Sequence, residues 1–418
     1  MSSALQSLPH VFGLLDVGTA KIVCLMLARN KLAGATLIGV GHQKSRGLKA
    51  GVVVDADAAE EAVRAAIAQA EDMSGETLDS VIVAAAAGRM ASVHVAARLE
   101  LGGRQVSQLD LDDLIDAGRQ YAQRNDRAAL HVNSIAVRLD GAMLPGHALG
   151  ASGQQLSLDV NAVAADRGPL RHLLHLIERC HLQVLAIAPA PLASALAVTT
   201  EAERQRGALV IDFGAGTTGI ALFVDGMLVA VHVIPIGSNH LTYDLSRALG
   251  TSLEEAERIK KKCAILPDAH TALDDTVTYQ QRSDDPADPQ QVPTKSVTRA
   301  DISTILTSRA DALLLQVLQR LEPLALAPQR YGEAILTGGG SLLGGLAAHA
   351  SNALGLPVRQ GAPLSHGSLP PALRHAAFTT ASGLEAIAAS PNLGCRFNPA
   401  PLRSMATTGG GSWARPSL

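Results

Sequence analysis

Two glycine-rich turns, each headed by an aspartate, carry the side chains of this 418-residue chain that are best suited to chemistry. Glycines let a ligand approach the backbone closely, and the N–H groups of such a turn can cradle phosphate oxygens. A carboxylate on each turn can hold Mg²⁺ through water, because this hard cation dehydrates reluctantly. The candidate phosphate and metal contacts of the two turns are Asp16, Gly18, Thr19, Lys21, Asp212, Gly214, Gly216, Thr217 and Thr218.

The second turn matches the pattern G-x-G-x-x-G from Gly214 to Gly219. That pattern binds a dinucleotide only where it leads from a strand into a helix. Here residues 220–224 are apolar and predict a second strand, so the dinucleotide interpretation fails on context. An ordinary hairpin turn explains one such pattern equally well, but two aspartate-headed hairpins could grip phosphates from both sides.

A third glycine run and a charged helix turn complete the set of candidate contacts. The glycine run ends a short strand predicted at 334–337, where the missing side chains allow close approach of a flat ring. The charged pair lies one turn apart on a helix predicted at 253–262, where a plain exposed ion pair is the alternative. These further candidates are Glu257, Lys260, Gly338, Gly339, Gly340 and Ser341.

The composition limits the classes of protein to consider. Hydrophobic residues make up 47% of the chain and aromatic residues 2%, which indicates an aliphatic core and disfavours stacking on nucleic-acid bases. The 35 basic and 38 acidic residues leave a formal charge of −3, so no nucleic-acid partner is expected. No apolar run approaches the ~18 residues that span a bilayer, and no signal peptide is visible. The cysteines lack a CxxC pair and are expected as reduced thiols in a cytoplasmic protein: Cys24, Cys180, Cys263 and Cys395.

The elements that must position the first turn form a mixed α/β unit. Periodicity predicts strands at 11–16, 21–27, 36–41 and 81–87 and a helix at 57–72. Residues 88–166 show a different pattern of elements, with a helix predicted at 111–123 among strands at 93–99, 134–139 and 155–163. We interpret them as a small α/β subdomain inserted into the first lobe.

The second half repeats the opening texture, which suggests a weak internal duplication. Strands are predicted at 209–213, 220–224 and 229–236, the last two joined by the hairpin pair Asp225-Gly226. Thr251 and Glu254 have capping-box spacing before the 253–262 helix. Further predictions are a polar loop at 266–298, a long helix at 302–321, a helix at 342–354 and an irregular tail from 391.

Taken together, these motifs resemble those of the actin/Hsp70/sugar-kinase superfamily and, within it, the FtsA family of bacterial cell-division actin homologues. The superfamily resemblance rests on the two aspartate turns and on residues 335–340. The narrower resemblance, which spans roughly residues 11–390, rests on segments 15–23, 45–53, 178–180, 233–237, 256–260 and 358–363.

The resemblance implies an actin-like, two-lobed (ribonuclease H-like) α/β fold that binds ATP and Mg²⁺ between the lobes. It implies polymerisation into filaments, binding of the C-terminal peptide of FtsZ near Arg299, and contacts of residues 88–166 with other division proteins. An exposed arginine near a helix cap is the plain alternative for Arg299. The implied parts are a first lobe core (11–87 and 167–205), the inserted subdomain (88–166), a second lobe core (206–245 and 310–390), its small subdomain (246–309) and the tail (391–418).

Two departures from the family pattern shape the expected function. Hydrolysing relatives carry a Glu or Gln that positions the attacking water, and Ala190 stands at that position. Since general-base help contributes about 10²–10⁴-fold, we expect at most weak ATPase activity, with nucleotide as a switch. The tail holds Trp413 but also Pro416, which forbids a useful amphipathic helix. We therefore expect an indirect link to the cytoplasmic face of the inner membrane at the division site.

Two other functions fit parts of the sequence. An FtsA-like, ATP-binding scaffold for a pilus or secretion assembly would show the same motifs with other partners. A sugar kinase would need an acidic catalytic base, against which Ala190 speaks. His172 and His175 lie on one predicted helix without a third metal ligand, which favours a solvated helix face over a zinc site.

Overall fold

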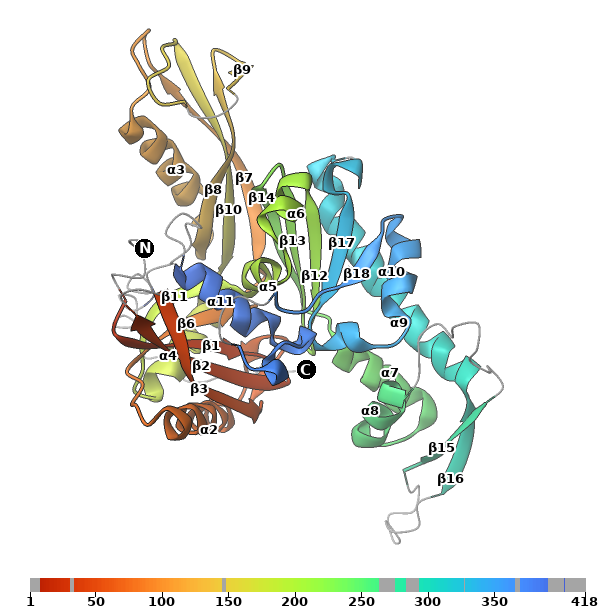
Figure 1. Cartoon of the computed structure of the whole chain (residues 1–418). Coiled ribbons are helices and arrows are strands. Elements are labelled where there is room, and N and C mark those ends of the chain that lie inside the picture. Colours follow the sequence, from red (N-terminus) through yellow and green to blue (C-terminus); the bar gives the residue numbers. More distant parts are fainter. Residues whose placement is uncertain are drawn as a thin grey trace.

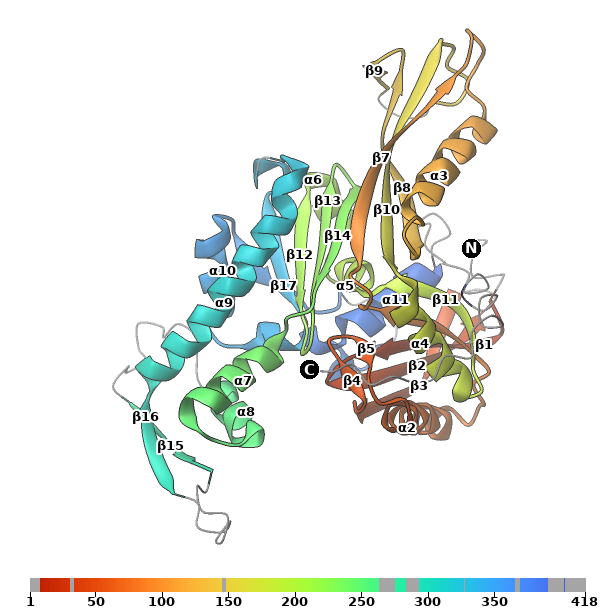
Figure 2. The same ribbon diagram turned by 180° about the vertical axis from the view of Figure 1, so that it is seen from behind.

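The computed structural model describes residues 8–30, 34–144, 148–262, 275–282, 293–326, 328–364, 369–389 and 402. These residues form two lobes, each built on a sheet, with further elements extending from them (Figures 1 and 2). In both views a sheet and helix project from the top of the molecule and a two-stranded hairpin from its lower side.

The first lobe is built on a five-stranded sheet in the order β11-β6-β1-β2-β3. β1 is antiparallel to β2 and parallel to β6, and its apolar residues are buried, as expected for a central strand covered on both faces. All four strands predicted in this region are confirmed. The bounds are β1 (Val11–Val17), β2 (Lys21–Asn30), β3 (Gly34–Lys44), β6 (Ser80–Ala85) and β11 (Gln183–Pro189).

Helices cover this sheet. The predicted helix at 57–72 is confirmed as α2 (Ala56–Ser74), which packs on β2 and β3; Asp55 caps its start and left-handed Gly75 ends it. α11 packs against β1, β6 and α5, so it joins the first lobe although it comes last in the chain (Figure 1). The remaining bounds are β4 (Leu48–Lys49), β5 (Val52–Val53), α4 (Arg167–Arg179), α5 (Ala190–Val198), α6 (Glu201–Arg206) and α11 (Thr379–Ala389).

The second lobe repeats the strand order of the first as β18-β17-β12-β13-β14. β12 is antiparallel to β13 and parallel to β17, which mirrors β1 with β2 and β6. Asp225 and Gly226 have φ values of 51° and 79° between β13 and β14, which confirms the predicted hairpin turn. The bounds are β12 (Ala208–Phe213), β13 (Thr218–Val224), β14 (Met227–Ile234), β17 (Glu333–Thr337) and β18 (Val358–Gln360).

Residues from the predicted insertion form a helix and a sheet that continues the second lobe's sheet. The nine-stranded order runs on from β14 through β7, β10, β8 and β9, and the described ladder pairing of β14 with β7 is His232 with Ala91. The chain enters and leaves this region from the first lobe, so the region touches both lobes. Its bounds are β7 (Ala91–Glu100), α3 (Gln108–Ala122), β8 (Arg127–Leu139), β9 (Ala142–Met143) and β10 (Gln155–Asp166).

Three predictions for the second lobe are corrected by the structure, one on a hairpin and two on helices. The polar loop at 266–298 contains an antiparallel hairpin, β15 (Thr276–Gln280) with β16 (Thr294–Thr298). The helix predicted at 342–354 is interrupted, because left-handed Gly345 separates a 3₁₀ turn (Gly339–Leu342) from α10 (Leu346–Leu354). The other bounds are α7 (Ser238–Leu249), α8 (Leu253–Lys262) and α9 (Arg299–Leu321).

The third correction concerns the start of α8. Ser252 caps this helix, because its hydroxyl accepts the N–H of Glu255 at 3.1 Å. The hydroxyl of Thr251 instead donates to the carbonyl of Gln280 next to β15. The capping spacing predicted from Thr251 is therefore one residue out of place.

Several predictions concern the termini and cysteines. Cys24 and Cys180 are buried free thiols, whereas Cys263 and Cys395 lie outside the described residues. The tail from 391 also lies outside them, except for Leu402, which is buried in the first lobe's core. Among the described helices none is both long enough and apolar enough to cross a membrane.

Candidate functional site

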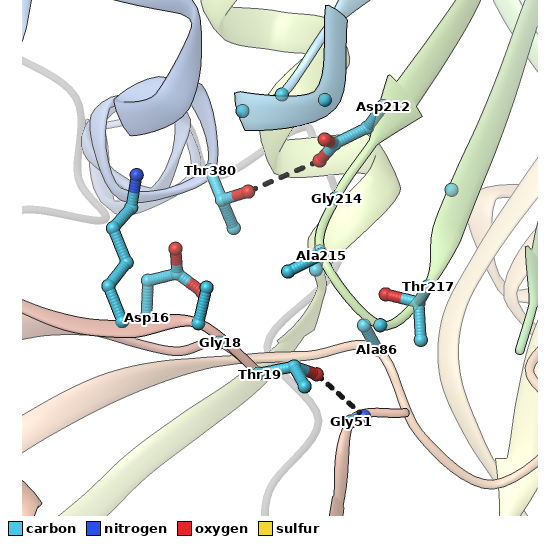
Figure 3. A pocket seen from close by; sticks show the side chains of 18 of the residues that line it. Asp16, Gly18, Thr19, Gly51, Ala86, Asp212, Gly214, Ala215, Thr217 and Thr380 are labelled. Carbon is cyan, nitrogen blue, oxygen red and sulfur yellow. Dashed lines mark hydrogen bonds between the residues drawn. The ribbon is translucent and has the colours of Figure 1, made fainter. Parts of the chain in front are cut away.

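A cavity of about 250 Å³ lies between the lobes, where the turns after β1 and β12 meet. Figure 3 shows the two turns approaching each other, with Asp16 and Asp212 pointing into the space between them. The third glycine run and the first residues of α5, α7 and α11 complete its walls. The predicted contacts that line it are Asp16, Gly18, Thr19, Lys21, Asp212, Gly214, Gly216, Thr217, Glu257, Gly338, Gly339 and Gly340.

The two turns have the same backbone geometry. The amide of Gly18 donates to the carbonyl of Lys21 at 3.0 Å, and the amide of Gly214 donates to the carbonyl of Thr217 at 3.0 Å. The turns also touch across the cavity, since a Cβ on Gly216 would lie 2.6 Å from the hydroxyl oxygen of Thr19. A side chain at this position would force the lobes apart.

The second turn directs backbone donors into the cavity. The carbonyls of Gly214 and Ala215 accept the amides of Ser238 and Asn239, at the start of α7, at 2.9 Å each. With these carbonyls bound to α7, the amides of Ala215 and Gly216 find no acceptor among the described residues. Free amides on a glycine turn are suited to binding an anion such as a phosphate.

Both aspartates are half-buried in the walls of the cavity, and their partial removal from water raises the pKa of each. Burial is the main reason that the pKa of Asp16 rises to about 6, with Lys21 lowering it and Asp212 raising it further. Burial also raises the pKa of Asp212, although hydroxyls from Ser194 and Thr380 donate to this carboxylate. The bond from Thr380 is 3.3 Å long (Figure 3).

Two half-buried carboxylates that face one cavity fit a divalent cation, which would offset their repulsion. They do not form a full coordination sphere, and the described residues contain no group of three or more His, Cys, Asp or Glu side chains that could hold a metal. Mg²⁺ suits such a site because it keeps several waters. Asp16 and Asp212 are the residues that would hold it.

Lys21 lies between the first turn and the segment before α11. Its ammonium donates to the carbonyl of Ala377 and sits 4.2 Å from the ring centre of Phe378. Burial lowers its pKa, while Asp16 and Asp212 raise it. Lys21 is thus the cation that balances both carboxylates in the absence of ligand.

Three predicted contacts do not line the cavity in this structure. Lys260 is buried beneath it, where its ammonium lies 2.6 Å from Glu257 and 2.8 Å from the hydroxyl of Thr242. Thr218 donates to the carbonyl of Ile236 at 2.7 Å, and Ser341 donates to that of Gly338 at 2.7 Å. Each side chain satisfies local backbone or a neighbouring charge, which spacing along the chain could not reveal.

The third glycine run closes the cavity beside Asp212. Gly338 has a φ of 83°, and a Cβ there would lie 2.3 Å from the Asp212 carboxylate and 2.7 Å from the carbonyl of Phe213. Only glycine fits such a close approach without displacing the carboxylate. Glu257 reaches the wall from α8 and keeps its pKa below the usual range through Lys260 and Thr242, against the effect of burial.

Three further residues support the two turns and were not among the predicted contacts. Ser194 and Thr380 hold the Asp212 carboxylate, and the amide of Gly51 donates to Thr19 at 3.2 Å (Figure 3). Gly51 has a φ of 75°, and the Gly47/Gly51 pair within 45–53 was the available signal. The hydroxyls carry no such signal, because they come from helices far from Asp212 in sequence.

Of the other residues singled out in the sequence, Ala190 lines the cavity, whereas Arg299, His172 and His175 do not. Ala190 lines it at the first residue of α5 and supplies no acid. Arg299 begins α9, where its Nε lies 3.7 Å from the carboxylate of Asp275. His175 lies 3.7 Å from Glu178 and, like His172, belongs to no metal cluster among the described residues.

Comparison with known proteins adds family and fold to this geometry. The family described as "Cell division protein FtsA" matches residues 209–383, and the "SHS2 domain inserted in FTSA" matches residues 87–164. The chain is 37% identical over 386 residues to "Cell division protein FtsA" of Rhizobium meliloti (strain 1021), covering 90% of this chain and 86% of that protein.

Solved structures show the same architecture at low identity. The "PilM-PilN type IV pilus biogenesis complex" matches with a TM-score of 0.62 at 17% identity, covering 92% of this chain and 100% of that one. "Crystal structure of MreB 5 of Spiroplasma citri bound to AMPPNP" matches with a TM-score of 0.55 at 16% identity, covering 91% and 96%. The predicted actin-like α/β fold is confirmed.

Proposed function

The chain belongs to the FtsA family of cell division proteins, as its motifs predicted, and we propose that it is an ATP-switched filament that links the FtsZ ring to the division machinery. It is an actin-like cell division protein. The proposal adds the ligand, the switch and the partners.

The observation that carries the proposal is the pair of half-buried aspartates on equivalent turns, Asp16 and Asp212, which face one cavity. A nucleoside triphosphate with Mg²⁺ supplies the phosphates and the divalent charge that this arrangement fits. The free amides of Ala215 and Gly216 would bind phosphate, and the run at Gly338 would lie against the adenosine.

The absence of an acid at Ala190 makes the nucleotide a switch in this proposal. The residue opens α5 on the cavity wall, and a methyl group neither orients nor deprotonates water. Binding between lobes whose turns touch would fix their closure and so favour one filament form. Slow hydrolysis would then set how long that form lasts.

The experiment measures nucleotide binding and turnover with the purified chain. We expect saturable ATP binding that requires Mg²⁺, filaments that sediment with ATP, and turnover at least tenfold slower than that of Ala190→Glu, since a restored acid can help the attacking water. Ala190→Gln, which can orient but not deprotonate water, should lie between them. Turnover of the natural chain as fast as that of a sugar kinase would contradict the switch.

The proposed FtsZ contact is tested separately. A C-terminal FtsZ peptide should bind the purified chain, and Arg299→Glu should weaken binding, whereas Arg320→Glu on the exposed end of the same helix should not. ATP binding without any peptide binding would favour the alternative of a scaffold in a pilus or secretion assembly. We also propose a location at the cytoplasmic face of the inner membrane at the division site, and co-sedimentation with anionic vesicles, with and without division partners, tests it.

A further inference from the structure

Helices α5 and α11 line two separate cavities. Their first residues, Ala190 on α5 and Thr380 on α11, face the cavity between the lobes. Their later residues line a second cavity of about 300 Å³, whose walls include Leu196, Leu369 and Ala386. The two helices pack directly against each other.

Among the described residues, the walls of the second cavity are apolar except for two side chains of α11, Ser382 and Glu385, which lie one helical turn apart. Ser382 is only 8% exposed, and its hydroxyl oxygen is buried without a hydrogen-bond partner. The carboxyl group of Glu385 has no ion pair or hydrogen bond within the described part of the chain, and burial raises its pKa to about 7. Unpaired polar groups of this kind are costly to bury.

An acid and a hydroxyl on one apolar wall define the chemistry of a ligand. Opposite charge on the ligand would stabilise the Glu385 carboxylate, and the hydroxyl of Ser382 could accept a donor beside it. Anions are disfavoured by the same carboxylate. The cavity equals the volume of about ten waters, so its ligand has on the order of ten non-hydrogen atoms.

We propose that this cavity is a second ligand site that takes a small amphiphilic amine. Its aliphatic body lies against Leu196, Leu369 and Ala386, and its ammonium group donates to Glu385 and Ser382. Nothing in the proposed nucleotide function requires such a site.

The shared helices couple the two sites. Ser194 on α5 and Thr380 on α11 both donate to Asp212, so a shift of either helix changes the position of this carboxylate. A ligand that wedges between the later turns of α5 and α11 therefore alters nucleotide affinity, and nucleotide alters amine affinity by the same factor. This second step rests on the proposed function, whereas amine binding itself does not.

The test uses n-hexylamine, with 1-hexanol and hexanoate as probes of equal chain length. At pH 8, where Glu385 is ionised, calorimetry with the full chain should show saturable binding of the amine, about tenfold tighter than the alcohol, and no binding of hexanoate. Glu385→Gln should bring amine and alcohol to equal affinity, and Ala386→Leu should abolish both by filling the cavity. Glu385→Leu should also abolish binding while raising the melting temperature, which separates loss of the site from loss of the fold.

The coupling arm repeats the ATP titration with saturating n-hexylamine. We expect a change of about fivefold in ATP affinity that disappears in Ala386→Leu. Amine binding that keeps its natural affinity in Glu385→Gln, that persists in Ala386→Leu, or that equals the binding of both other probes, would overturn the site. Normal amine binding in a chain that does not bind ATP would leave the site standing and remove the proposed nucleotide function instead.

Discussion

The turn after β1 and the turn after β12 share one backbone geometry but differ in what surrounds their aspartates. Each turn closes with the same 3.0 Å bond from its glycine, and each leading strand pairs with an equivalent set of neighbours. Asp212 accepts hydrogen bonds from Ser194 and Thr380, whereas the principal partner of Asp16 is the charge of Lys21.

This difference shows how a duplicated motif acquires two roles. α5 and α11 pack together, and α5 also packs against β12 and β13, the strands on both sides of the second turn. Hydroxyls of the two helices fix the direction of the Asp212 carboxylate. The ionised Asp16 carboxylate is electrostatically unfavourable until a ligand cation offsets its charge. The first turn therefore lowers the stability of the fold without ligand, whereas the second turn holds its carboxylate in a fixed direction.

Asp16→Asn tests how much the ionised Asp16 carboxylate destabilises the fold, and it has the largest expected effect. The pKa of Asp16 is raised from 3.8 to about 6, so ionising it destabilises the fold as pH rises from about 4 through 6. A pKa shift of this size lowers the free energy of unfolding by about 3 kcal/mol, and the effect is complete above pH 7. We expect Asp16→Asn to raise the free energy of unfolding without ligand at pH 7.5 and to leave it unchanged at pH 4.

The control for this measurement is Asp212→Asn, followed by urea unfolding at both pH values. Its gain at pH 7.5 should be smaller, because two hydroxyls already stabilise that carboxylate. Equal gains for the two variants would show that the two turns are equivalent in energy as well as in geometry.

Asp212→Asn is expected to weaken ATP binding about a hundredfold in the presence of Mg²⁺. The variant removes a fixed carboxylate that would hold metal-bound waters, and two such charge-assisted hydrogen bonds account for a loss of about 3 kcal/mol. Calorimetric titration with Mg²⁺ and with EDTA measures it. The natural chain and the variant should have similar affinities in EDTA, and a persistent difference would assign Asp212 a role without metal.

Lys21→Met removes the cation between the two turns and should weaken ATP binding by roughly tenfold. The lysine offsets both carboxylates and contacts Ala377 and Phe378, so its loss also raises the pKa of Asp16 further. Lys44→Met is the matched control, because Lys44 pairs with Lys21 across β2 and β3 but is exposed. An unchanged ATP affinity in Lys21→Met would show that Lys21 is not the cation that offsets the two carboxylates during binding.

Ser194→Ala has the smallest expected effect and tests the geometry of the second turn. Loss of one hydroxyl should cost about 1 kcal/mol of stability and weaken Mg²⁺-dependent ATP binding severalfold. Thr380→Val loses the longer 3.3 Å bond to Asp212 and the 2.8 Å bond between the hydroxyls of Thr380 and Ser194, and it should weaken Mg²⁺-dependent binding less than Ser194→Ala because Ser194 still donates to Asp212. Thermal unfolding together with the Mg²⁺ titration reports both effects, and a loss of stability with full Mg²⁺ dependence would make Ser194 merely structural.

Much of the fold was predictable because local patterns are strong where strands are apolar and turns are glycine-rich. The strands on both sides of each turn, helix α2 and the Asp225-Gly226 hairpin follow from such patterns. The pattern did not reveal the interruption at Gly345, and it placed the cap of α8 at Thr251 instead of Ser252. Short helices begin and end on details that periodicity does not resolve.

The sequence by itself determined the two aspartate turns, the third glycine run and the family, since each is a local run of residues. Tertiary structure alone decided that Thr218, Lys260 and Ser341 turn away from the cavity while Ser194 and Thr380 turn towards Asp212. The reason is physical: a side chain's partner is fixed by the packing of elements far apart in the chain, and spacing along a strand or helix carries no record of it.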